Sequence, residues 1–452
     1  MNKKVKHVTI WNAITSLLLQ LITILSGFII PRLILRTFGS EVNGLISSLN
    51  QFLNYVTLLE GGISSVILAS LYKPLYEKDS DKISSVVKTT QQFYKKLAMI
   101  FIGYTLLLAI LYPIIFSLSF SYQYVFSLTL ILSINIFVQY NFSASWKLLL
   151  NADKKVYIVS LIQIILIILN TVLFAILINL FPNIHFLKLI TASVYLLQPI
   201  CFHRFVKKYY QIDPNVKEDE KLLKSRWDGF GISIAAFIHK NTDIAILTFF
   251  TNLKVVSIYS VYNLVTNGLR LIITSFSAGI IPTMGHLYAK NNKEELNQLF
   301  SFYEYIIFLG TFFFFTVGAL LITPFVLLYT KNVTDINYYE PIFGLLLILS
   351  EAIFCIKEPF VNIAYSAGKF KEIKKHAYIE AGLNIVISII LVNMYGLIGV
   401  AIGTLIAMTY RTAYHIIYLK SNILKRSLWK FMKKLICFSV ITALGVLLCK
   451  LI

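Results

Sequence analysis

Long apolar runs constrain the fold of this chain more than any other feature of its sequence. Thirteen of them follow one another along the 452 residues. Each is long enough to cross about 30 Å of hydrocarbon as an α-helix, which rises about 1.5 Å per residue. Their polarity does not alternate from residue to residue, which excludes transmembrane β-strands. The predicted membrane spans are 9–31, 43–71, 97–118, 122–146, 156–181, 184–205, 229–250, 256–284, 303–329, 340–366, 376–395, 398–419 and 435–452.

The composition excludes a soluble enzyme. Hydrophobic residues make up 57% of the chain and charged residues 14%, whereas soluble domains carry about 25% charged residues. The four cysteines all lie in apolar runs without the spacing of a metal site, so we interpret them as small apolar side chains. The sequence contains neither a phosphate-binding P-loop nor a nucleophile elbow. We therefore predict a transporter without catalytic residues and without a metal.

The net charge of +20 comes from 41 basic and 21 acidic residues. If the N-terminus is cytoplasmic, the cytoplasmic connections hold 31 of the basic residues and the outer connections hold 6. The remaining 4 lie inside predicted spans. The bias alternates from loop to loop without inversion, as the positive-inside rule requires. The charge thus indicates a multi-pass protein with a cytoplasmic N-terminus, and nucleic acid is not a predicted partner.

The two halves of the chain share a weak internal repeat. Short matches recur at an offset of 212–215 residues, so that Asn50 corresponds to Asn263 and Asn170 to Asn384. The offset equals six spans, an even number, which means that both halves enter the membrane in the same sense. Parallel six-helix repeats are a transporter architecture. We predict a six-helix lobe over 1–208, a cytoplasmic linker over 209–228, a second six-helix lobe over 229–422, and a basic segment with an additional hydrophobic helix over 423–452.

Polar residues inside the spans are the candidates for function, because a charged side chain at the bilayer centre costs at least about 2.5–3.5 kcal/mol. The densest set is His239, Lys240 and Asp243 in the span 229–250. Their spacings of three and four residues place them on one helix face, where they can pair. The sequence leaves two interpretations open, an internally neutralised structural cluster or the lining of a cavity.

Arg270, near the middle of the span 256–284, has no acidic residue within a turn of its own helix. A carboxylate from another helix or a phosphate could satisfy it. The guanidinium suits phosphate because its planar fork donates two hydrogen bonds and stays charged. We therefore rank Arg270 first among the candidates for substrate contact. Arg32 and Arg36, at the outer end of the first span, are either interfacial side chains or part of a basic cavity.

Acidic residues mark other spans. Glu60 precedes Gly61–Gly62, and glycine pairs are sites at which helices bend. Glu351 lies in the span 340–366. Glu380 and Arg411 lie in the next two spans, where either an interhelical salt bridge or a role in substrate binding is open. Amide side chains in the spans are interpreted mainly as hydrogen-bonding contacts between helices; they include Asn12, Asn50, Asn54, Asn135 and Gln139.

Three segments of the chain resemble one known family. Residues 31–72, with the sequence PRLILRTFGSEVNGLISSLNQFLNYVTLLEGGISSVILASLY, are similar to the first two helices of bacterial polysaccharide flippases. Residues 241–265, NTDIAILTFFTNLKVVSIYSVYNLV, resemble the region of helices 7 and 8 in that family, and residues 366–407 are a third match. The family is the polysaccharide transporter branch of the multidrug/oligosaccharidyl-lipid/polysaccharide (MOP) flippase superfamily.

The resemblance implies an all-α polytopic membrane protein with a MATE-like fold. Two six-helix bundles would form parallel repeats, to which this chain adds one C-terminal hydrophobic helix. It also implies a bacterial inner-membrane flippase that moves undecaprenyl-pyrophosphate-linked oligosaccharide units to the outer leaflet by alternating access. Such flippases supply O-antigen, capsule or exopolysaccharide assembly. Membrane lipids and a polymerase would be further partners.

The resemblance further implies a cationic central cavity. Its candidate substrate-binding residues are basic and lie in or beside the spans: Arg270, Lys240, His239, Arg32, Arg36 and Arg411. Transport could be coupled to H⁺ or Na⁺, and no other cofactor is expected. The candidates for ion coupling are acidic residues within the spans: Asp243, Glu60 and Glu351. Tyrosines in the cleft could stack on sugar rings, but the sequence does not identify them.

Three alternatives stay open. A multidrug or cation antiporter of the same superfamily would favour acidic residues in its cavity, and the basic residues in the middle of the spans argue against it. A lipid II flippase is not distinguished from the preferred function by any of these residues. A membrane glycan polymerase or ligase is disfavoured because such an enzyme needs a sizeable outer loop, and the outer loops here are short.

Overall fold

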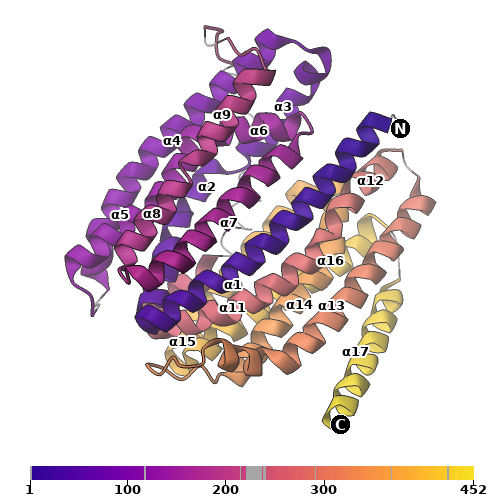
Figure 1. Ribbon diagram of the computed structural model, residues 1–452. Helices are drawn as coiled ribbons and strands as arrows, with labels where there is room; N and C mark the ends of the chain where they lie inside the picture. The colour runs from indigo at the N-terminus through magenta and orange to yellow at the C-terminus, as the bar shows by residue number, and fades with distance from the viewer. Residues whose placement is uncertain are drawn as a thin grey trace. The chain divides into compact units, whose positions relative to one another are not determined.

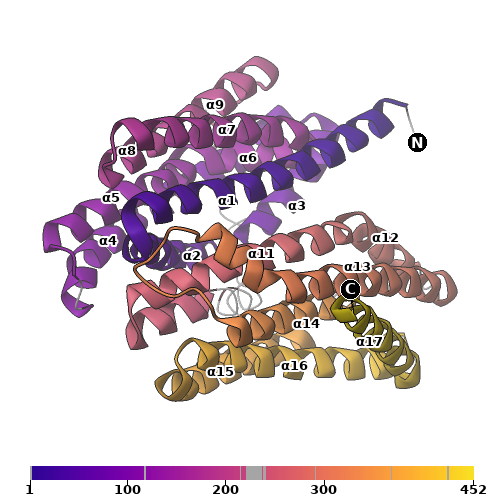
Figure 2. The same ribbon diagram turned by 60° about the horizontal axis from the view of Figure 1, so that its bottom comes forward.

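The chain is helical and divides into two compact units, Met1–Ile234 and Ala235–Ile452 (Figures 1 and 2). The computed structural model describes residues 3–116, 119–213, 215–219, 237, 241–290, 292–367, 369–424 and 427–451. Every regular element within these ranges is a helix, which confirms the predicted all-α class. The two units are described separately below.

The first unit contains two pairs of long helices: α1 packs along α7, and α4 packs along α5. Asn12 of α1 ties one of these pairs: it accepts a hydrogen bond from the Tyr157 backbone and donates one to the Lys154 carbonyl, each 2.9 Å long. This confirms the predicted role of that amide between helices. The elements are α1 (Lys3–Leu53), the 3-10 turn η1 (Asn54–Val56), α2 (Thr57–Glu60), α3 (Ile63–Glu77), α4 (Ser80–Ile115), α5 (Tyr122–Val138), the π-helical turn η2 (Gln139–Ser143), α6 (Ala144–Ala152), α7 (Val156–Leu180), α8 (Ile184–Val194) and α9 (Leu197–Tyr209).

The first two predicted spans are separated by a break inside α1. This element consists of two helices joined at a kink, which lies within the connection over 32–42 that the spans 9–31 and 43–71 predict. Only Gly39 leaves the helical conformation, with φ 84° and ψ 179°, because glycine alone tolerates this backbone geometry without strain. The bend predicted at Gly61–Gly62 is confirmed: the two glycines have φ 24° and 79° and separate α2 from α3.

The helices of the second unit pack against one another: α15 packs on α16, α16 packs on α14, and α13 packs on both α11 and α14. Residues 241–250 are helical and precede α11. The added C-terminal helix α17 packs on α13, where Lys434 forms an ion pair with Glu304. The elements are α11 (Leu253–Ser275), α12 (Ser277–Ala289), α13 (Lys293–Tyr329), α14 (Pro341–Ser366), α15 (Phe370–Tyr395), α16 (Leu397–Asn422) and α17 (Leu428–Leu451).

Eight helical stretches within the described ranges are long and apolar enough to cross a membrane. The number is smaller than the thirteen predicted spans partly because most of 9–31 and of 43–71 falls into the single kinked stretch Ile10–Glu60. In addition, α14 carries three charges within eight residues, Glu351, Lys357 and Glu358. Apolar length thus identifies a multi-pass membrane protein, and the more polar helices gather in the second unit.

Helices α15 and α16 approach each other closely because glycines lie at their contact. Gly399 and Gly403 are four residues apart, the spacing of small residues that lets membrane helices touch. A Cβ atom built on Gly403 would lie 2.8 Å from the backbone nitrogen of Ser388, a distance that such atoms do not adopt. This contact sets the separation of the helices that carry Asn384 and Thr404, two residues of the site described next.

We predict that Gly403→Ala destabilises the protein by about 1–3 kcal/mol, because the added methyl group must push α15 and α16 apart. Thermal unfolding of the purified protein in detergent measures this change. Gly382→Ala on α15 is the matched control, since a Cβ atom there meets nothing within 4 Å. An unfolding temperature that is equally unaffected in both variants would contradict the proposed close contact.

Candidate functional site

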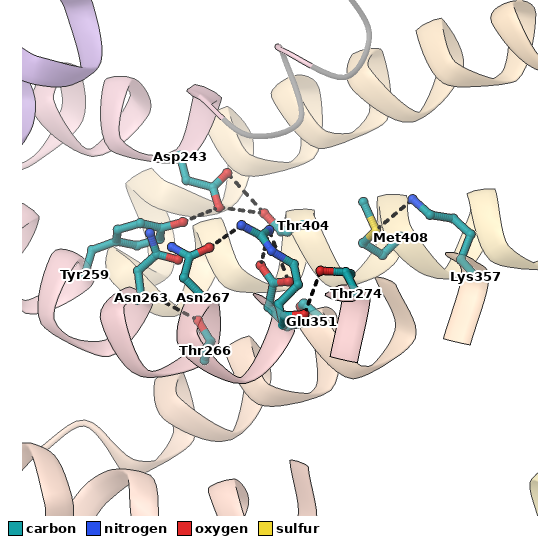
Figure 3. A network of polar contacts seen from close by, with 12 residues as sticks. Asp243, Tyr259, Asn263, Thr266, Asn267, Thr274, Glu351, Lys357, Thr404 and Met408 are labelled. Carbon is teal, nitrogen blue, oxygen red and sulfur yellow. Dashed lines mark hydrogen bonds and ion pairs between the residues drawn. The ribbon is translucent and has the colours of Figure 1, made fainter. Parts of the chain in front are cut away.

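The first polar group of the second unit surrounds Arg270, and two of its members, Asn267 and Glu351, are labelled in Figure 3. Nη1 of Arg270, on α11, lies 3.1 Å from Oε1 and 3.3 Å from Oε2 of Glu351 on α14. Its Nη2 donates a hydrogen bond to Asn267 Oδ1, and Cζ lies 5.4 Å from the centre of the Phe354 ring. Of the two partners that the sequence left open for Arg270, the structure shows a carboxylate from another helix.

Both side chains of the Arg270–Glu351 pair are partly exposed, Arg270 by 17% and Glu351 by 15%. A guanidinium has five N–H donors, and the contacts named above use only its two terminal nitrogens. An approaching anion can therefore share the guanidinium with Glu351 or displace it. Contact between Arg270 and a phosphate stays a prediction, and this geometry permits it.

A second polar group surrounds Asp243, whose side chain is buried (Figure 3). The carboxylate accepts hydrogen bonds from the Tyr259 hydroxyl at 3.0 Å and from the Thr404 hydroxyl at 3.0 and 3.1 Å. Asn384 donates to Thr404 Oγ1 at 2.8 Å. Its own Oδ1 is buried and has no hydrogen-bond partner among the described residues. Three helices and the stretch 241–250 thus bring oxygen atoms of three chemical kinds together.

The chemistry of this oxygen group suits a hard cation or a proton. Carboxylate, amide and hydroxyl oxygens are ligands of hard cations, whereas transition metals favour imidazole and thiolate. Across the described residues, no three His, Cys, Asp or Glu side chains gather as a metal centre would require. Asp243 thus lies among hydroxyl oxygens of Tyr259 and Thr404, and its role in ion coupling stays a prediction.

The predicted cluster around Asp243 is described only in part. His239 and Lys240, the other two members, lie outside the described residues. Whether they pair with Asp243 or line a cavity stays a prediction. Tyr259, Thr404 and Asn384 were not predicted from the sequence as neighbours of Asp243; Thr404, for example, is 161 residues away along the chain.

Arg411 belongs to a separate buried ion cluster of the second unit. It forms an ion pair with Glu380, and its Nε lies 3.0 Å from Nε2 of His415. Lys357 Nζ lies 3.7 Å from the other carboxylate oxygen of Glu380. The Glu380 side chain is 1% exposed, so this cluster is enclosed by protein. The structure shows the interhelical salt bridge that the sequence left open, and a contact of Arg411 with substrate stays a prediction.

We predict that Glu380→Ala lowers stability by about 3–5 kcal/mol, because it leaves the buried cations Arg411 and Lys357 without their shared carboxylate. Thermal unfolding in detergent and the yield of folded protein measure the loss. Glu294→Ala, at an exposed site on α13, removes the same side chain without a buried partner and should leave both unchanged. Equal stability of the two variants would contradict the role assigned to Glu380.

Glu60 lies beside a pocket of about 440 Å³ in the first unit. Its Oε1 accepts hydrogen bonds from Ser64 at 2.5 Å and from Tyr94 at 2.8 Å, and Oε2 accepts one from Tyr140 at 3.4 Å. Lys147 also lines the pocket. Four amides that the sequence assigned mainly to helix contacts share this lining: Asn50, Asn54, Asn135 and Gln139.

Arg32 and Arg36 lie on α1 and are exposed, as both interpretations of the sequence allow. Neither lines the pocket beside Glu60. Two pairs of residues that the sequence singled out do lie in contact. Arg270 forms an ion pair with Glu351, and Arg411 forms one with Glu380.

The fold resembles that of solved transporters, one of which belongs to the MOP superfamily. Among solved structures, the chain is similar to an inward-facing multidrug resistance MATE family transporter of this superfamily, with a TM-score of 0.69 and 14% identity over 90% of this chain and 98% of that one. It is similar to the lipid II flippase MurJ in an inward closed conformation, with a TM-score of 0.70 and 18% identity over 97% and 92%. A eukaryotic MATE transporter aligns with a TM-score of 0.64 and 14% identity over 92% and 95%.

These likenesses are structural. No protein-family model and no curated protein sequence matches the chain. The solved structures named above are transporters and a flippase, and they confirm the predicted MATE-like class of fold. The substrate has to be argued from the residues of the chain itself.

Proposed function

We propose that this chain is a flippase of the inner membrane that moves undecaprenyl-pyrophosphate-linked oligosaccharide units from the cytoplasmic to the outer leaflet. The observation that carries the proposal is Arg270, a partly exposed guanidinium in the middle of a predicted span. Arginine binds phosphate oxygens through paired hydrogen bonds and keeps its charge in an apolar setting. The fold resembles that of a MATE transporter solved in an inward-facing conformation, which supports transport of this cargo by alternating access.

The chemistry of the cargo explains why a polar centre is needed in a membrane protein. A pyrophosphate and a chain of sugar hydroxyls cannot enter hydrocarbon unaided, because buried charge and unpaired polar groups are both costly. A basic, hydrated path lowers this cost, while the prenyl tail stays in the lipid. Arg270 would hold the pyrophosphate, with Lys240, His239, Arg32 and Arg36 as further basic contacts along the path.

Ion coupling is the second part of the proposal. Binding of H⁺ or Na⁺ to Asp243, with Asn384 and Thr404 contributing oxygen atoms, would favour one conformation of the second unit. The buried, unpartnered Oδ1 of Asn384 supports this assignment, because a buried polar atom without a partner is costly unless a ligand satisfies it. Glu351 and Glu60 are the alternative coupling residues, and Glu351 would act through its ion pair with Arg270.

A deletion strain of the native host tests the function. If the proposal holds, lipid-linked oligosaccharide accumulates on the cytoplasmic side of the inner membrane, and mass spectrometry of the extracted lipid identifies its glycan. Accumulation of the peptidoglycan precursor would instead indicate a lipid II flippase. Translocated single repeat units would indicate a polymerase, and increased drug sensitivity without any lipid-linked intermediate would indicate a multidrug antiporter. Each of these three results contradicts the proposal.

A further inference from the structure

The pocket beside Glu60 is bounded by two interruptions of regular helix. On one side, Gly61 and Gly62 adopt positive φ angles and separate α2 from α3. On the other side, the π-helical turn Gln139–Ser143 interrupts the path from α5 to α6. Irregular backbone in a membrane bundle is tolerated where it lines a cavity, and π-helical turns are frequent at functional sites. Two such segments at one pocket indicate a built site.

The side chains of the pocket form an unusual set for a membrane protein. Five carboxamides line it: Asn50, Asn54, Asn135, Gln139 and Gln198. A carboxamide both donates and accepts hydrogen bonds, as a hydroxyl group does, so amides can match neighbouring hydroxyls of a ligand. The rings of Tyr94 and Tyr140 stack with their centres 5.8 Å apart and 16° between their planes. They present hydroxyl groups that already converge on Glu60.

Ser143 adds an independent observation. It is 2% exposed, lines the pocket, and its Oγ has no hydrogen-bond partner within the described part of the chain. A buried hydroxyl without a partner costs about 1–3 kcal/mol, which a hydroxyl-bearing ligand can recover. The π-helical turn that ends at Ser143 is the backbone irregularity that places this atom.

The balance of charged residues in the pocket lining indicates which class of ligand the pocket can bind. Its lining holds one acidic residue, Glu60, and one basic residue, Lys147. A site with balanced charges and many amides disfavours a strongly charged anion or a free cation and favours a neutral polyhydroxylated molecule. Its volume of about 440 Å³ falls within the range of about 300–1,000 Å³ typical of small-molecule sites.

We propose that the pocket formed by Glu60, the stacked pair Tyr94 and Tyr140, and the surrounding amides binds a sugar ring. The inference rests on the proposed function, since it makes this pocket the place where the first unit recognises the glycan of the cargo. Amide and carboxylate groups would hold the ring hydroxyls, and Ser143 would hydrogen-bond one of them.

The experiment uses the full-length purified protein in lipid nanodiscs and free methyl pyranosides as probes. Saturation-transfer NMR of the methyl glycosides of glucose, galactose and N-acetylglucosamine detects weak binding without the lipid. The test variant is Asn54→Leu with Gln139→Leu, because both residues are exposed and their replacement leaves the core intact. Asn393→Leu, an exposed amide on α15 away from the pocket, is the matched control.

We expect at least one pyranoside to bind the wild-type chain, with affinity about tenfold lower in the double variant and unchanged in the control. Asn135→Leu is a second, single variant and should show the same direction of change. Absence of saturation transfer from all three pyranosides, or equal binding by all variants, overturns the sugar site. Failure of the flippase proposal is seen separately in the deletion strain, which reports the accumulated lipid and not this binding.

Discussion

Replacement of Arg270 with alanine is expected to abolish export of the lipid-linked glycan without reducing the amount of protein in the membrane. The guanidinium is partly exposed and held by Glu351 and Asn267, so it is oriented before the cargo arrives. Two lost hydrogen bonds to a charged group correspond to about 3–6 kcal/mol, or more than about a hundredfold in binding. Complementation of the deletion strain measures export, and immunoblotting of membranes measures the protein.

Two further variants sharpen this test. Arg270→Lys keeps the positive charge but loses the planar fork, so it should restore export only in part. Lys331→Ala removes an exposed basic residue near the end of α13 and should export as the wild type does. Normal export by Arg270→Ala at a normal protein level would remove this residue from the substrate site and leave its pair with Glu351 as a structural contact.

The second large effect is expected for Asp243→Asn, which should uncouple transport from its ion. If Na⁺ is the coupling ion, NaCl stabilises the wild type against heating more than KCl does at the same ionic strength. At a ligand concentration about a hundred times the dissociation constant, the stabilisation is about 2.7 kcal/mol. The variant removes the charge of the oxygen group and should lose this difference. If the proton is the coupling ion, the wild type instead responds to pH, and the variant loses that response.

The matched control for this test is Asp335→Asn, because Asp335 lies in the exposed connection between α13 and α14. Differential scanning fluorimetry supplies the unfolding temperatures, and export in the deletion strain supplies the functional result. A response to Na⁺ or pH in Asp243→Asn that equals the response of the wild type would exclude this carboxylate as the coupling group.

Much of the membrane-embedded fold followed from the sequence because hydropathy acts locally. An apolar run of sufficient length must form a helix in lipid, whatever its neighbours are. The added segment 435–452 was predicted in this way, and its described part, 435–451, lies within α17. The bend at Gly61–Gly62 was also local, since a glycine pair weakens the helix where it occurs. The break between the first two spans is local too, since the non-helical residue Gly39 lies within the predicted connection over 32–42.

The candidate sites could be predicted only as separate residues. Arg270, Glu351, Asp243 and Glu60 were identifiable because charge within a span is rare and costly. The partners of Asp243 were not identifiable, because they are supplied by other helices and carry neutral side chains. Thr404 and Asn384 are two such partners in the second unit. The interpretation of amides as helix contacts held for Asn12 but missed the pocket that Gln139 and its neighbours line.

The sequence by itself determined that this chain is a multi-pass helical membrane protein with few charges inside its spans. These properties depend on each residue's own transfer energy between water and lipid, which can be read along the chain. The tertiary structure decided which ion pairs are enclosed by protein, as Arg411–Glu380 is, and which stay partly exposed, as Arg270–Glu351 does. It also decided that hydroxyls and amides converge on Asp243 and Glu60. Such contacts depend on the packing of helices far apart in sequence, and no local pattern encodes them.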